Sequence, residues 1–186
     1  MTFGCVGNTI RLRSGAYFDL LHPQPDQFTL ADIAGALSKI CRFGGQVDRF
    51  YSIAEHSYWC AWQAKQDGLS EDIQRACLMH DAAEAFIGDV VKPLKIMLPE
   101  YAKIEARIEA VIAGKYGLDF THKAVKQIDR ELLIAERRAL FTRDGVKWSG
   151  EGDVRSLKVP ISGWLHRQSE TVFLGRASDL GLEVTK

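Results

Sequence analysis

Residues 70–95 place ionisable side chains on a helix face that should be buried, and this feature constrains the fold more than any other. The apolar residues recur at the three- and four-residue spacing of one helical face: Ile73, Ala76, Cys77 and Ala85. His80, Asp81 and Glu84 fall on that same face. Burying an imidazole and two carboxylates without partners would cost several kcal/mol. A metal cation is the simplest partner, because adjacent His and Asp residues offer one neutral and one anionic ligand.

The same stretch carries the signals that begin and end a helix. Ser70 is a favourable N-cap, and Glu71 and Asp72 follow in the first turn, where the helix dipole favours negative charge. Gly88 is typical of a helix end, and Asp89 follows in the exit loop. We therefore expect one helix ending at Gly88. A single buried His is more often a hydrogen-bonded core residue, but four ionisable groups within residues 80–89 are harder to satisfy in that way.

The totals predict one folded domain without a bulk charge. The chain has 186 residues, which suits a single domain over residues 1–186, and 46% of them are hydrophobic, enough for a core. The formal net charge is zero. We therefore expect no general electrostatic attraction to nucleic acid or to an anionic membrane. No apolar run approaches the roughly 20 residues needed to span a bilayer.

The N-terminal sequence and the cysteines favour the cytoplasm. Residues 1–15 lack an apolar core of signal-peptide length. The four cysteines are scattered and form no CxxC pair: Cys5, Cys41, Cys60 and Cys77. Because Cys60 and Cys77 lie on apolar helical faces, we expect reduced thiols in a cytoplasmic protein.

Periodicity along the rest of the chain predicts an all-α bundle. Alternation from Thr9 to Arg13 predicts a short extended N-terminal arm. Further helices are expected at about residues 29–41, 52–66, 99–116, 121–141 and 164–180, with Thr121 as the cap of the fourth. The core should span about residues 30–141. The glycine- and charge-rich segment 142–160 should form a mobile surface loop before the last helix, in the C-terminal part 142–186.

Three of these helices present ligand-type side chains inward. His56 lies on the buried face of helix 52–66, and Asp129 lies on or beside the apolar stripe of helix 121–141. Together with the His-Asp pair at 80–81 they form a mixed nitrogen and oxygen set, which suits Zn, Mn, Co, Ni or Fe and is tolerable for Mg. Glu136 lies beside the same stripe as Asp129 and is better explained as the partner of an arginine, such as Arg42 or Arg138.

The order H…HD…D on successive helices resembles the HD-domain phosphohydrolase superfamily. The run HDAAE at residues 80–84, followed by Asp89 and Lys95, is similar to its deoxynucleotide-directed branch, which includes bacterial 5′-deoxynucleotidases and small deoxynucleoside triphosphate triphosphohydrolases. The segments ICRFGG at 40–45 and RFYSIAEHS at 49–57 resemble the same branch. The resemblance covers about residues 30–140 and implies an HD-domain helical bundle.

The resemblance also implies a role for each candidate side chain. The residues implied to hold one divalent metal ion are His56, His80, Asp81 and Asp129. Glu84 is implied to handle the proton of the attacking water. Asp89 is implied to assist by hydrogen bonding or by steering the leaving group, although capping of the turn that follows it is the alternative.

A small nucleotide substrate is implied by the same resemblance. Arg42 matches an arginine that reaches substrate phosphate, and its alternative role is to pair with Asp48 or Glu55 at a helix end. Lys95 and Lys126 match positions that face phosphate, although Lys95 could instead be solvated. Phe43 stands where family members often have a tryptophan that packs near the sugar or base. Because family members are commonly dimers or larger, we expect a homo-oligomer.

The implied reaction is hydrolysis of the 5′ phosphate ester of a deoxynucleotide. A divalent metal lowers the pKa of bound water and polarises a phosphoryl oxygen. Cationic side chains stabilise the charge on the phosphate oxygens. A monophosphate would give nucleoside and phosphate, and a triphosphate would give nucleoside and triphosphate. The alternatives are a cyclic-nucleotide or alarmone phosphohydrolase and a non-catalytic nucleotide-binding HD protein.

Overall fold

The computed structural model describes residues 6–183, and helices account for most of its regular structure. The all-α class predicted from periodicity is therefore confirmed. The helices are α1 (Leu30–Leu37), α2 (Ile53–Gln66), α3 (Glu71–Met79), α4 (Glu84–Ile87), α5 (Lys92–Lys95), α6 (Pro99–Tyr116), α7 (Lys123–Leu140) and α8 (His166–Asp179). Short 3-10 turns occur at Pro25–Gln27, Arg42–Gly45 and Glu151–Asp153. Cys5 lies outside the described residues, and the other three cysteines are free thiols.

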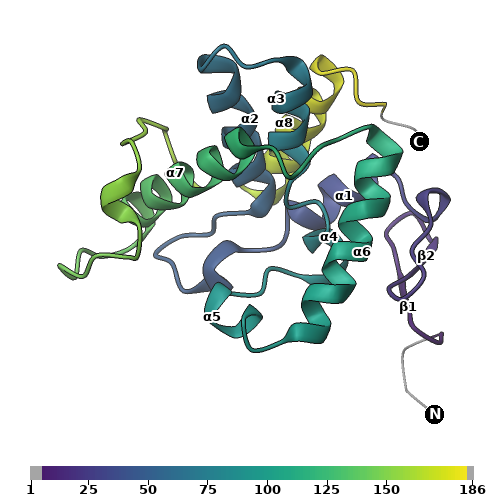
Figure 1. Ribbon diagram of the computed structural model, residues 1–186. Coiled ribbons are helices and arrows are strands. Elements are labelled where there is room, and N and C mark those ends of the chain that lie inside the picture. The colour runs from purple at the N-terminus through teal and green to yellow at the C-terminus, as the bar shows by residue number, and fades with distance from the viewer. Residues whose placement is uncertain (1–5, 184–186) are drawn as a thin grey trace.

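The predicted N-terminal arm is a small antiparallel hairpin. Strand β1 (Thr9–Arg11) pairs with β2 (Tyr17–Asp19), and Ile10 lies opposite Phe18. The Phe18 ring is buried and stacks on the ring of Phe86 from α4, with centroids 3.9 Å apart. This contact fixes the hairpin to the helical core. In Figure 1 the hairpin lies on the opposite side of the molecule from the segment that follows α7.

Helix α2 is central to the bundle and packs against α3, α7 and α8 (Figure 1). It begins as predicted, because the side chain of Ser52 accepts a hydrogen bond from the backbone N–H of Glu55. Most of its residues are buried, His56 completely. The helix therefore carries that imidazole into the interior, between α3 and α7.

The stretch from Ser70 to Gly88 is broken, so the prediction of one continuous helix is wrong. Helix α3 ends at Met79, residues 80–83 form turns, and α4 begins at Glu84. The His80 side chain explains the break: its Nδ1 lies 2.9 Å from the carbonyl oxygen of Cys77, to which the N–H of residue 81 would donate in a regular helix. Ser70 occupies the N-cap position of α3, but its side chain makes no capping hydrogen bond.

Two other helix boundaries differ from the predictions. Helix α1 ends at Leu37 rather than near residue 41, and Arg42–Gly45 forms a separate turn. Helix α7 is capped by His122, whose Nδ1 accepts from the N–H of Ala124, because the hydroxyl of Thr121 donates to Asp119 instead. Helix α6 begins at Pro99 and ends before Gly117 as predicted.

The segment after α7 has little regular structure, but it is attached to the bundle. Arg155 pairs with Asp67 at the end of α2 and with Glu131 on α7. Arg137 on α7 pairs with Glu151. These ion pairs hold segment 142–160 against the bundle.

Within residues 6–183, no helix has both the length and the apolar character required to cross a membrane.

Candidate metal centre

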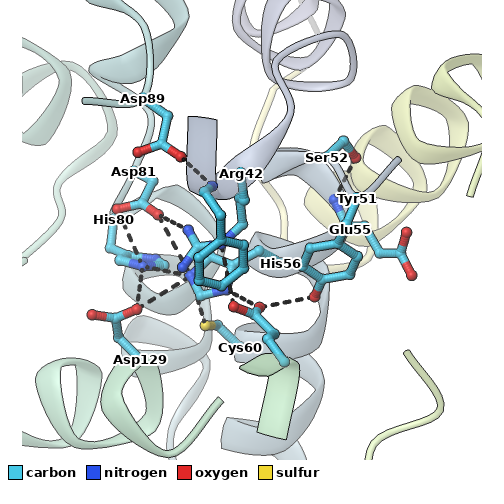
Figure 2. A network of polar contacts seen from close by, with 12 residues as sticks. Arg42, Tyr51, Ser52, Glu55, His56, Cys60, His80, Asp81, Asp89 and Asp129 are labelled. Carbon is cyan, nitrogen blue, oxygen red and sulfur yellow. Dashed lines mark hydrogen bonds and ion pairs between the residues drawn. The ribbon is translucent and has the colours of Figure 1, made fainter. Parts of the chain in front are cut away.

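Four side chains from three parts of the fold meet at one point, with the imidazole of His56 surrounded by the other three. Its Nε2 lies 3.2 Å from Nε2 of His80, 3.5 Å from Oδ2 of Asp81 and 3.3 Å from Oδ1 of Asp129. The His80 nitrogen is in turn 3.3 Å from Asp81 Oδ1 and 3.7 Å from Asp129 Oδ1. Figure 2 shows the three side chains gathered around the ring of His56. The structure thus brings together all four predicted ligand residues.

The turn at residues 80–83 explains how two adjacent residues both reach this point. Successive side chains on a regular helix point about 100° apart. The end of α3 at Met79 releases Asp81 from that constraint, and its carboxylate turns toward His56. Asp129 arrives from the middle of α7. The centre therefore depends on the broken helix that the sequence did not predict.

The hydrogen bonds of the other ring nitrogens define the tautomers. His56 Nδ1 lies 2.5 Å from Oε1 of Glu136, and His80 Nδ1 lies 2.9 Å from the carbonyl oxygen of Cys77. Both acceptors require a proton on Nδ1. In the neutral rings, the Nε2 lone pairs then face each other across 3.2 Å. Two facing lone pairs repel, so this arrangement requires a proton or a metal cation between them.

The pKa values of His80 and Asp129 indicate which of the two groups carries a proton in the absence of metal. Burial lowers the pKa of His80, but Asp81 and Asp129 together raise it to about 9. Burial raises the pKa of Asp129, but hydrogen bonds from His56 and His80 hold it well below its ordinary value. Without metal the cluster is therefore held together by protonated imidazole. A metal ion must displace these protons, so metal and protons compete for the site.

Cys60 provides a further donor that the sequence analysis did not assign. It follows His56 by one helical turn, and its Sγ lies 3.6 Å from His56 Nε2. His56, Cys60 and His80 each bring one donor atom within 4.8 Å of the others, an arrangement that could hold a metal ion. Burial and then Asp129 raise the pKa of the Cys60 thiol well above its ordinary value. The sulfur is therefore a neutral thiol, a weaker ligand than a carboxylate.

Glu136 contacts His56 on the side of the ring that faces away from the other three clustered residues. Besides His56, its carboxylate accepts a hydrogen bond from the Tyr51 hydroxyl at 2.9 Å. Its Oε2 lies 3.2 Å from Nε of Arg42, but the N–H does not point at the oxygen, and neither atom has a hydrogen-bond partner. The prediction that Glu136 pairs with an arginine is confirmed for Arg42. Its contact with His56 was not predicted, although Glu136 lies two helical turns after Asp129.

Arg42 and Asp89 make contacts inside the site. Arg42 Nη1 donates to Oδ2 of Asp81 at 3.1 Å, so the alternative pairing with Asp48 or Glu55 is wrong. Asp89 Oδ2 accepts the backbone N–H of Phe43 at 3.2 Å, which is a capping role in the Arg42–Gly45 turn. Burial raises the pKa of Asp89. Both side chains help to fix this turn beside the cluster (Figure 2).

Glu84 is a strongly perturbed carboxyl group near the centre. It is buried, and its Oε2 has no hydrogen-bond partner. Burial and the charges of Asp81 and Asp89 raise its pKa to about 10, against the opposing effect of Arg42 and Lys95. A strongly perturbed carboxyl beside a ligand cluster is a candidate for proton transfer.

The two predicted lysines differ in their surroundings. Lys95 is partly buried, and its Nζ lies 2.5 Å from Oε1 of Glu105, so it is not a free solvated lysine. Lys126 is exposed on α7, one turn before Asp129. Within residues 6–183, neither lysine makes an ion pair with the four clustered residues. The outer side of the cluster is open, because the Asp129 side chain is 40% exposed.

Comparison with known proteins finds two uncharacterized relatives. The chain is 41% identical to the uncharacterized protein YfdR of Escherichia coli over 140 residues, which are 75% of this chain and 76% of that protein. It is 34% identical to an uncharacterized protein of Rhodobacter capsulatus over 113 residues, 58% of each chain. No family model matches the sequence.

Proposed function

The chain belongs to the same family as YfdR of Escherichia coli, and we propose that it is a metal-dependent phosphohydrolase that cleaves the 5′ phosphate ester of deoxynucleotides. The observation that carries this proposal is the convergence of two Nε2 atoms and two carboxylates from α2, the turn after α3, and α7. Along the chain, these four residues follow the H…HD…D order of HD-domain phosphohydrolases.

The residues fit a divalent metal ion. His56, His80, Asp81 and Asp129 would hold it, and the proton required on each Nδ1 leaves the Nε2 atoms free to donate their lone pairs. When bound, such an ion acidifies water and polarises a phosphoryl oxygen. The set is richer in nitrogen than Mg sites usually are, which favours a transition metal such as Mn, Co, Ni, Fe or Zn.

Glu84 is the group proposed to take the proton from the attacking water. Without metal its raised pKa keeps the carboxyl protonated at neutral pH. A neighbouring divalent charge favours the carboxylate, which brings the pKa toward the working range of a general base. Asp89 holds the Arg42–Gly45 turn in place through the Phe43 N–H.

Cationic side chains would bind the phosphate. Arg42 uses one N–H on Asp81, and its guanidinium has further donors for a phosphate oxygen. Lys95 would have to exchange its contact with Glu105 for one with the substrate. Arg42 is therefore proposed both to orient Asp81 and to stabilise charge on the phosphate.

Product analysis tests the proposal directly. The protein loaded with Mn²⁺, Co²⁺ or Mg²⁺ is incubated with dAMP and with dATP, and the products are separated by ion-exchange chromatography. We expect deoxyadenosine with phosphate from dAMP, or with triphosphate from dATP. Asp129→Ala should abolish turnover, whereas Asp179→Ala, an exposed carboxylate at the end of α8, should not.

A panel of cyclic nucleotides and alarmones separates the alternative hydrolases. Hydrolysis of those compounds without hydrolysis of dAMP or dATP would replace the proposed substrate class. Tight nucleotide binding with stoichiometric metal and no product would favour a non-catalytic nucleotide-binding protein.

A further inference from the structure

Three aromatic rings meet beside the candidate metal centre. The Phe43 ring lies edge-on to that of Phe141, with centroids 5.2 Å apart, and 6.2 Å from that of Trp148. The rings of Phe141 and Trp148 are themselves 5.7 Å apart. Phe141 caps the C-terminal end of α7 and Trp148 belongs to the following segment. Both lie outside residues 30–140, the part of the sequence that resembles HD-domain proteins.

Phe43 joins this aromatic cluster to the metal centre. The Arg42 guanidinium carbon lies 5.4 Å from the centre of the Phe43 ring, and the same guanidinium donates to Asp81. Asp89 accepts the backbone N–H of Phe43. The Phe43 backbone has a φ of 59°, a left-handed conformation that is unfavourable for a non-glycine residue. Such a conformation persists only where its surroundings hold it, and here a hydrogen bond and two rings do so.

Beside two of these rings lies a cavity of about 320 Å³, whose lining does not include Phe43. Phe141 and Trp148 line it, and the guanidinium of Arg137 lies 4.8 Å from the centre of one Trp148 ring. The cavity lining carries more cations than carboxylates: Arg137, Arg138, Arg143 and Lys147 against Asp144 and Glu151. Small-molecule pockets in proteins typically span about 300–1,000 Å³, so this cavity suits a ligand no larger than a mononucleotide. Cations at the edge of a cavity attract anionic ligands.

The resemblance already places Phe43 near the sugar or base; we infer that Phe141 and Trp148 extend it into an aromatic wall that receives the base of the substrate, and that Trp148 is a specificity-determining residue. This inference rests on the proposed function. A base is planar and stacks on aromatic side chains. A single guanidinium separates Phe43 from the ligand Asp81, so a phosphate at the metal centre places its attached base near these rings. Trp148 adds the largest ring surface of the wall.

The test compares a substrate that has a base with one that lacks it. Trp148→Ala, Trp148→Phe and the wild-type protein are loaded with Mn²⁺ and assayed on dAMP and on 2-deoxyribose 5-phosphate. For Trp148→Ala we expect a rise of about tenfold in KM for dAMP, equivalent to about 1.4 kcal/mol, and no change with 2-deoxyribose 5-phosphate. Trp148→Phe should restore most of the affinity for dAMP.

A control and a binding measurement separate this inference from the proposed function. Trp62→Ala removes a tryptophan from the separate cluster with Trp59 and should leave the preference for dAMP unchanged. An equal loss on both substrates, or no loss on either, would overturn the inference. If the protein hydrolyses neither compound, the proposed function fails, and binding of deoxyadenosine by equilibrium dialysis tests the inference instead. Binding should weaken in Trp148→Ala and recover in Trp148→Phe. Equal binding by these two variants and the wild-type protein would refute the aromatic wall.

Discussion

Glu136 contacts the ring of His56 at the nitrogen that faces away from the metal centre. Its Oε1 lies 2.5 Å from Nδ1, and both side chains are fully buried. The contact defines which nitrogen of His56 carries the proton and turns Nε2 toward His80, Asp81 and Asp129. A carboxylate behind a ligand histidine also raises the basicity of the ring. Glu136 should therefore control metal affinity without touching the metal.

Replacement of Glu136 measures this support. We expect Glu136→Gln to weaken metal binding by about 10–100-fold, the usual effect of removing such a partner. The amide oxygen can still accept the Nδ1 proton, so the fold should survive. Competition with a chelator of known affinity gives the dissociation constant. Unchanged affinity in Glu136→Gln would show that the carboxylate serves Arg42 and Tyr51 alone.

Asp81 and Cys60 offer competing third ligands, and metal content distinguishes them. We expect Asp81→Ala to lose bound metal and Cys60→Ala to retain it, because a metal ion could use Cys60 only by deprotonating a buried thiol whose pKa is well above its ordinary value. Metal analysis after gel filtration gives the stoichiometry. Cobalt-loaded protein provides a second measurement, since a thiolate ligand would add a near-ultraviolet charge-transfer band that Cys60→Ala lacks. The reverse pattern of metal retention would assign the centre to His56, Cys60 and His80.

Glu84→Gln should separate proton transfer from metal binding. The glutamine keeps the shape of the side chain but cannot accept the proton. We expect kcat on dAMP to fall by about 10²–10⁴-fold, the typical contribution of a general acid or base. Metal content and the dissociation constant for dAMP should stay close to the wild-type values. A variant with normal turnover would exclude Glu84 from the mechanism.

The same carboxyl group should make the stability of the metal-free protein depend on pH. Burial and the charges of Asp81 and Asp89 raise the pKa of Glu84 in the folded state to about 10, from an ordinary value of 4.5. Between these two values the folded protein keeps a proton that the unfolded chain has lost. Its contribution to stability is therefore fully present below the ordinary pKa and declines as pH rises toward 10.

Urea unfolding of wild-type protein and Glu84→Gln in EDTA measures this decline. The free energy of unfolding of the variant, relative to wild type, should rise with pH between 6 and 9, by at most about 1.4 kcal/mol per pH unit. Other titrating groups contribute to both proteins and largely cancel in the difference. A difference that stays constant over this range would mean that Glu84 titrates normally.

Local signals in the sequence predicted most of the fold, and long-range contacts account for the errors. Pro99 and Gly117 mark the ends of α6 correctly, because a proline and a left-handed glycine act on their own neighbours. The break after Met79 depends on His80 bonding back to a carbonyl, which periodicity cannot show. The apolar residues of this stretch recur at the same spacing whether it forms one continuous helix or two helices joined by a turn. Their spacing alone could therefore not predict the turn.

The candidate centre was predictable in its residues and less so in its support. His56, His80, Asp81 and Asp129 are recognisable because polar ligand types occupy apolar helical faces. Cys60 and Glu136 lie at helical spacing from His56 and Asp129, but a cysteine or a glutamate there has several structural explanations. Trp148 stands in a segment without periodicity, so no sequence pattern could associate it with Phe43.

Gly163 should be required for the attachment of the C-terminal segment behind α2. Glu55, next to His56, accepts hydrogen bonds from the backbone N–H groups of Ser162, Gly163 and Trp164. Gly163 has a φ of 76°, and a Cβ there would lie 2.6 Å from the carbonyl oxygen of Phe50. An alanine would be both strained and in collision with the backbone. The segment would have to shift away from Glu55, leaving that buried carboxylate without its donors.

We expect Gly163→Ala to lower the free energy of unfolding by about 1–3 kcal/mol. Gly175→Ala is the matched control, because Gly175 lies within α8 with no atom close to the added methyl group. That substitution should raise stability by about 0.5–1 kcal/mol, the usual gain of replacing a helical glycine by alanine. Urea unfolding of both variants gives the two values. If Gly163→Ala proved as stable as Gly175→Ala, the turn at residues 162–164 would not be held by Glu55, and the C-terminal segment would have to be attached through the packing of α8 alone.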